Sequence, residues 1–173
     1  MIHFNPILKP ITTINNYKMC KKPQISFCAN DTFEKSYECY DVQCNIDKNA
    51  CSEEFPQDYL YTKDKKTYLK PHYMILHLES LKKGGGTMAI KSVLKKSLEN
   101  PLTQGRIVLF STTLDGKSYP SGFYYKMGFR LTEENKNRVL ENWLAAGGKK
   151  EISPRIEGTM YLPKENIEHC LNY

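Results

Sequence analysis

Three consecutive glycines between an apolar segment and an amphipathic one constrain this chain more than any other feature of its sequence. The apolar segment His72–Ser80 has the length and alternation of a β-strand, and the stretch after residues 84–86 has apolar residues at helical spacing. Asn100-Pro101 ends that helix, because proline disfavours helical backbone in the residue before it. Glycines allow a sharp turn and close approach of a ligand, and a helix start offers unpaired N–H groups. The junction is therefore a predicted site for a pyrophosphate, with Lys82 and Lys83 adding charge at its rim.

The two periodicities predict which side chains face the core. In the strand, one predicted face carries Ile75, His77 and Glu79, and the opposite face carries Leu76, Leu78 and Ser80. In the helix, the predicted buried stripe consists of Ile90, Val93, Leu94 and Leu98.

Four further elements are predicted after this helix. They are a buried strand at 106–112, a short helix at 121–127 that ends at Gly128, an amphipathic helix at 132–146 and a last strand at 158–162. The predicted apolar side of the amphipathic helix comprises Val139, Leu140, Trp143 and Leu144. This order of strands and helices indicates an α/β or α+β domain.

The first 70 residues have weaker periodicity. Short strands are predicted at 25–28, 37–42, 59–62 and 67–69, with a turn at 64–66. Four cysteines in this half, Cys28, Cys39, Cys44 and Cys51, lack the closely spaced pairs of structural zinc sites, so no metal site is predicted.

Charge and hydropathy restrict the partners. Lys and Arg number 25 against 19 Asp and Glu, a formal net charge of +6, which suits an anionic ligand such as a nucleotide cofactor or a nucleic acid. The sequence contains neither a run of about 18 apolar residues nor the layout of a secretory signal. A cytoplasmic location without a membrane partner is expected.

The glycine junction matches neither a P-loop nor a complete dinucleotide fingerprint. Instead, residues 82–87 (KKGGGT), the buried strand at 106–112 and residues 122–129 (GFYYKMGF) together resemble the GCN5-related N-acetyltransferase family. The family's cofactor signature is Arg or Gln, two residues of any kind, Gly, any residue, then Gly or Ala. The resemblance implies one domain over 1–173 with a best-matched core at 70–163 and a divergent part at 1–69. It also implies a mixed, mostly antiparallel central sheet flanked by helices.

By resemblance, the fourth and fifth strands splay apart and the pantetheine arm of acetyl-CoA lies between them. The implied cofactor-binding residues are Leu76 and Leu78 on the strand, then Lys82, Lys83, Gly84, Gly85, Gly86 and Thr87. Tyr124 aligns with the family's tyrosine that protonates the departing thiolate, and Tyr125 is a substitute for it. Glu79 is the preferred base for the acceptor amine, and His77 is the alternative.

The resemblance implies direct transfer of an acetyl group to the primary amine of a small molecule or protein, and the lack of a cysteine in either motif fits such a transfer. Three departures from the family pattern are Leu81, in place of Arg or Gln, Lys117, in place of Asn, and a longer path to the last strand through residues 147–156. Two alternatives stay open: an acetyltransferase directed at RNA or the ribosome, as in tRNA-modifying toxins, and a degenerate module that binds CoA without catalysis. The RNA alternative is not favoured, because a solvated basic surface explains the same charge. These motifs carry no information on oligomeric state.

Overall fold

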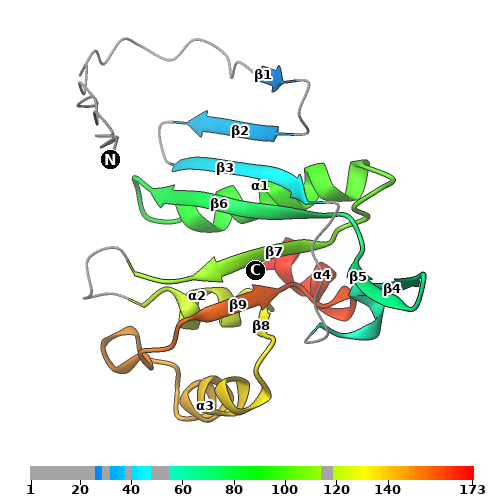
Figure 1. Ribbon diagram of the computed structural model, residues 1–173. Coiled ribbons are helices and arrows are strands. Elements are labelled where there is room, and N and C mark those ends of the chain that lie inside the picture. Colours follow the sequence, from blue (N-terminus) through cyan, green and yellow to red (C-terminus); the bar gives the residue numbers. More distant parts are fainter. Residues whose placement is uncertain (1–25, 29–31, 38–39, 48–54, 114–118) are drawn as a thin grey trace, which may run out of the picture.

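A seven-stranded sheet forms the centre of the molecule (Figure 1). The structure is a computed structural model that describes residues 26–28, 32–37, 40–47, 55–113 and 119–173. In sheet order, the strands are β1 (Ser26–Cys28), β2 (Thr32–Tyr37), β3 (Tyr40–Asp47), β6 (His72–Ser80), β7 (Ile107–Ser111), β9 (Gly158–Tyr161) and β8 (Arg130–Leu131). Strands β6 and β7 run parallel, and every other neighbouring pair is antiparallel.

Helices cover one face of this sheet and a hairpin covers part of the other. The helices are α1 (Gly85–Glu99), α2 (Ser121–Lys126), α3 (Glu134–Ala145) and α4 (Ile167–Asn172), with short 3-10 turns η1 (Gln57–Tyr59), η2 (Lys150–Ile152) and η3 (Lys164–Asn166). Their buried side chains join those of one sheet face in the main core. On the second face, η1 and the hairpin of β4 (Leu60–Lys63) and β5 (Lys66–Leu69) enclose a smaller cluster around Val108. The expectation of a mixed, mostly antiparallel sheet flanked by helices is confirmed.

The strand–glycine–helix unit has the predicted form. Strand β6 has the predicted bounds, and α1 is capped at its C-terminus by Asn100, which has extended backbone before proline. Strand β7 and helix α2 also agree with the predicted segments within a residue or so at each end.

The predicted alternation along β6 is wrong, because the strand contains a β-bulge. Gln43 of β3 pairs with His77, but the next residue, Cys44, pairs with Ile75, so Leu76 is an extra residue on β6. An extra residue reverses the phase of all side chains after it. Leu78 consequently packs on the same core as Ile75, and Leu76 is 64% exposed.

Two predicted helix stripes need correction as well. Leu98 on α1 and both Val139 and Leu144 on α3 are exposed, whereas Ser97 and Asn137 are buried. These polar groups are buried because they bond to neighbouring backbone. The Ser97 hydroxyl donates to the Arg106 carbonyl at 3.1 Å, and the Asn137 amide bonds both backbone groups of Leu131 at 2.8 Å.

The first half is organised differently from the prediction. The predicted strand at 37–42 is divided between β2 and β3, and the predicted strand at 59–62 begins as η1. Residues 25, 39, 51 and 117 and the side chain of Cys28 lie outside the described part of the structure. The Cys44 side chain is buried. Among the described residues, no helix has the length and hydropathy needed to cross a membrane.

Candidate cavity between the separating strands

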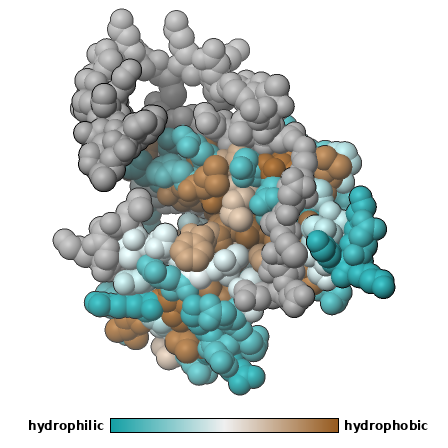
Figure 2. Space-filling view, in the orientation of Figure 1, coloured by the Kyte–Doolittle hydropathy of each residue, from teal (hydrophilic) through white to brown (hydrophobic). Residues whose placement is uncertain are grey.

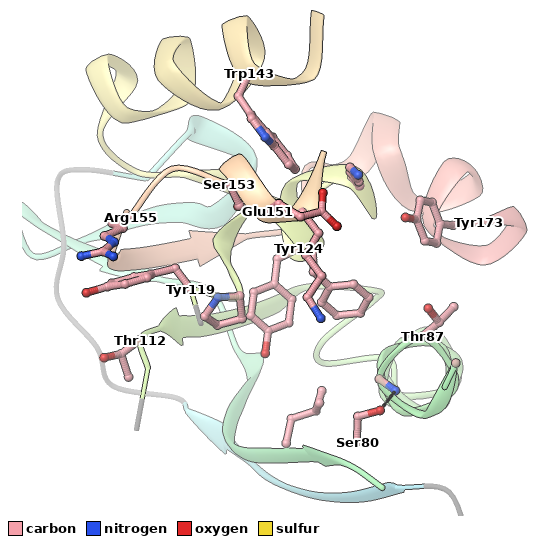
Figure 3. Close-up of a pocket in the computed structure, with 17 residues that line it drawn as sticks. Ser80, Thr87, Thr112, Tyr119, Tyr124, Trp143, Glu151, Ser153, Arg155 and Tyr173 are labelled. Carbon is pink, nitrogen blue, oxygen red and sulfur yellow. Dashed lines mark hydrogen bonds between the residues drawn. The ribbon is translucent and has the colours of Figure 1, made fainter. Parts of the chain in front are cut away.

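A cavity of about 1060 Å³ lies where β6 and β7 separate. The two strands pair only from Tyr73 with Ile107 to Ile75 with Leu109, and β6 then continues to Ser80 without β7 beside it. The surface in Figure 2 is hollowed between the C-terminal ends of these strands. The lining residues come from the ends of both strands, the start of α1, helix α2, the segment from α3 to β9, and the residue after α4 (Figure 3).

The glycine turn forms one end of this cavity. Gly84 has a left-handed φ of +86°, a conformation that costs a residue with a Cβ atom about 1–2 kcal/mol. The Gly85 N–H donates to the Lys82 carbonyl at 2.9 Å, and the Gly86 N–H donates to the Ser80 hydroxyl at 3.1 Å. Within the described residues, the N–H groups of Gly84 and Thr87 have no hydrogen-bond acceptor. Two of the four predicted amide donors therefore bond to none of the described residues and belong to residues that line the cavity, and the other two hold the turn together.

Ser80 is a residue that the sequence did not single out for this site. Its hydroxyl accepts from Gly86 and donates to the Lys82 carbonyl at 3.0 Å, so it links the end of β6 to the first turn of α1. A Cβ atom on Gly86 would lie 3.3 Å from the Phe123 ring. The lack of a side chain at the third glycine therefore allows α1 to pack closely against α2, and Gly86 also lines the cavity.

Tyr124 stands in the middle of the cavity wall. Its ring packs against Phe123 and Phe129 with centroid distances of 5.2 and 5.9 Å, and only 8% of the residue is exposed. Figure 3 shows the phenol pointing from α2 into the space above β6. Burial raises the pKa of Tyr124 to about 12, because the phenolate would lose its hydration. At neutral pH this group is a protonated hydrogen-bond donor.

Tyr125, the predicted substitute, is placed elsewhere. It does not line the cavity, and the Arg130 guanidinium lies over its ring at 4.2 Å. The structure thus separates the two neighbouring tyrosines by environment, and Tyr124 is the one with access to a ligand.

The cavity wall carries more positive than negative groups. Lys126, Lys150 and Arg155 line it, with Glu151 as its carboxylate. The Lys126 ammonium donates to the Gly148 carbonyl at 2.5 Å and lies 4.8 Å from the Trp143 ring centre, so it also anchors the wall. This charge balance favours an anionic ligand.

Several predicted site residues lie outside the cavity. Leu78, Gly84, Gly86, Thr87 and Tyr124 line it, whereas Leu76, Glu79, Lys82, Lys83 and Gly85 do not. The Glu79 side chain is 59% exposed, and its Oε2 lies 4.0 Å from Nε2 of His77. The role of Glu79 as a base stays a prediction.

The segment between β8 and β9 supplies a part of the wall that the sequence motifs did not indicate. It contributes Trp143, Lys150, Glu151, Ser153 and Arg155. The Trp143 indole N–H donates to the Lys149 carbonyl at 3.0 Å, which ties η2 to α3. No local motif marks these residues, because their place depends on how α3 folds back over α2.

Comparison with family models, curated proteins and solved structures found no match to this chain. Among the described residues, no group of three or more His, Cys, Asp and Glu side chains is arranged to hold a metal ion.

Proposed function

We propose that this protein transfers an acyl group, with acetyl as the simplest case, from acyl-CoA to a primary amine on a GCN5-related N-acetyltransferase type of fold. The observation that carries the proposal is the separation of β6 from β7 into a cavity with open amides at one end and Tyr124 in its wall. The sheet order and the parallel β6–β7 pair, with α1 between them in the chain, support the same fold type.

The residues present fit a CoA thioester. The amides of Gly84 and Thr87 at the start of α1, with the positive charges of the wall, suit its diphosphate. Beyond Ile75, the β6 backbone that faces the cavity no longer pairs with β7, so it is available to the amide groups of a pantetheine arm. Such pairing to an unpaired strand edge is a common way to bind extended ligands.

The proposed reaction replaces a C–S bond by a C–N bond and moves one proton. The neutral acceptor amine attacks the thioester carbonyl, the new C–N bond forms, and the C–S bond breaks to release the CoA thiolate. Tyr124 donates a hydrogen bond to the departing sulfur, and a carboxylate takes the amine proton. Glu79 is the predicted base, and Glu151 is the carboxylate that lines the cavity. Cys44 and Cys170 are buried and do not line the cavity, which suits direct transfer without a covalent acyl-enzyme.

Calorimetric titration with CoA tests the proposal by comparing alanine substitutions at two glycines, one that lines the cavity and one that does not. Gly84 and Gly147 both have positive φ, of 86° and 97°, and a Cβ atom on either would meet no atom within 4 Å. Only Gly84 lines the cavity. Each substitution by alanine should cost about 1 kcal/mol of stability from backbone strain.

Gly84→Ala should also weaken CoA binding by about tenfold or more, because the new methyl group occupies ligand space. Gly147→Ala should bind CoA as the unmodified protein does. Absence of any heat with millimolar CoA, or equal binding by both variants, contradicts the proposal. Binding of CoA without thiol release across an amine panel would instead favour the non-catalytic module, and salt-sensitive RNA binding would favour the RNA-directed alternative.

A further inference from the structure

Tyr173 is an aromatic residue of the cavity that the proposed chemistry does not use. It follows α4 and is 47% exposed, and it lines the cavity together with the start of α1. In Figure 3 its ring lies on the same side as Thr87, whereas Thr112, Tyr119 and Arg155 lie on the opposite side. The ring therefore belongs to the phosphate end of the cavity.

The contacts of α4 agree with this placement. Helices α1 and α4 pack against each other, and Ile167 at the start of α4 lies beside the end of α1: a Cβ atom on Gly105 would lie 2.8 Å from Cδ1 of Ile167 and 3.0 Å from Cδ2 of Leu98. From there the chain runs through α4 to Tyr173, which lines the cavity together with Thr87.

Tyr173 is also held in a defined position. Cys170 is fully buried in the main core, and the His169 ring bonds the Lys126 carbonyl through Nε2 at 2.8 Å. The Tyr173 N–H donates to the His169 carbonyl at 2.9 Å, and the two rings make an edge contact at 6.0 Å. An aromatic ring fixed in this way loses little conformational entropy when a ligand stacks on it.

Building on the proposed function, we propose that Tyr173 is the stacking platform for the adenine base of the CoA nucleotide. In CoA, one ribose separates the base from the diphosphate, so an aromatic ring beside the start of α1 is within reach of the base. Every purine offers a flat π-face, and stacking of a base on an aromatic side chain changes affinity by about 5- to 150-fold.

Two ligands and four proteins test this assignment. The ligands are CoA and 4′-phosphopantetheine, which lacks the 3′-phosphoadenylyl group and with it the adenine base. The proteins are the unmodified chain, Tyr173→Ala, Tyr173→Phe and Tyr61→Ala. Tyr61 is a matched control, because it is also a partly exposed tyrosine but lies on the β4–β5 hairpin and does not line this cavity.

Tyr173→Ala should weaken CoA binding by about 5- to 150-fold and leave 4′-phosphopantetheine binding unchanged. Tyr173→Phe and Tyr61→Ala should bind both ligands normally, and all variants should keep their melting temperature. Unchanged CoA binding by Tyr173→Ala would overturn this inference and leave the proposed function intact. An equal loss for both ligands would show that Tyr173 only shapes the cavity, which also overturns it. If the unmodified protein binds no CoA, the proposed function itself fails and this inference fails with it.

Discussion

Replacement of Tyr124 by phenylalanine is the most informative test of the chemistry, because it removes one hydroxyl from the cavity and leaves the ring. Burial raises the pKa of Tyr124 to about 12, whereas a thiol has a pKa of about 8.5. The phenol is therefore still protonated when the C–S bond breaks, and it can either donate a hydrogen bond to the developing thiolate or give up its proton, the role that the family resemblance implies. We expect the hydrogen bond to have the smaller effect on rate.

The expected loss of kcat in Tyr124→Phe follows from the strength of this hydrogen bond. A hydrogen bond to a charged group contributes about 1.5–3 kcal/mol, so Tyr124→Phe should lower kcat by about 10- to 150-fold. The KM for acetyl-CoA should change little, because the hydroxyl acts on charge that develops only as the C–S bond breaks. Release of free CoA thiol measures both constants directly.

Tyr125→Phe is the matched control. It makes the same chemical change at the next position of the same helix, on a buried ring outside the cavity. Its kcat should stay within about twofold of that of the unmodified protein, as expected for a group that does not contact the reacting atoms. An unchanged kcat in Tyr124→Phe, or equal losses in both variants, would refute the role of the Tyr124 hydroxyl. A loss well beyond 150-fold would instead indicate that the phenol does transfer its proton.

Further predictions concern the pH dependence of stability through His72 and the roles of the carboxylates Glu151 and Glu79. The buried His72 ring bonds the Lys70 carbonyl through Nδ1, and burial lowers its pKa, so the unfolded chain binds the proton more readily. Its contribution to stability should be complete above pH of about 6.5 and decline as the pH falls below it, by at most about 1.4 kcal/mol per pH unit. Urea unfolding at several pH values should show this slope, and His72→Gln should abolish it. Glu151→Gln should lower kcat/KM for the amine by about fivefold, because an exposed ion pair between this carboxylate and the acceptor ammonium contributes about that much. A larger loss of kcat/KM in Glu79→Gln would identify Glu79 as the base.

Local signals explain which parts of the fold were predictable. Strand β6, the glycine turn and helix α1 each depend on residues within a few positions of one another, and their bounds agree with the prediction. The turn at Asp64 and Lys65, both with positive φ, was also marked by its own residues. Propensity, capping and turn chemistry act over this short range, so a single sequence reveals them.

The parts of the cavity that the sequence did not predict depend on contacts between distant segments. Lys126 reaches the Gly148 carbonyl across 22 residues, and the η2 segment with Glu151 takes its place from that bond and from the Trp143 indole. Tyr173 reaches the cavity only because α4 packs against α1. No pattern within α4 or η2 indicates these positions, since each follows from packing of the complete chain.

The bulge at Leu76 determines where the side chains of Ser80 and Glu79 lie relative to the cavity. Under strict alternation, the face of Ile75 would continue through His77 and Glu79, and the carboxylate predicted as a base would face the cavity. The extra residue reverses the phase, so Leu78 and Ser80 take that face and Glu79 turns to the other side. The same reversal places the Ser80 hydroxyl beneath the Gly86 amide. One inserted residue therefore both stabilises the glycine turn and removes the predicted base from the cavity, which is why Glu151 is the carboxylate to test beside it.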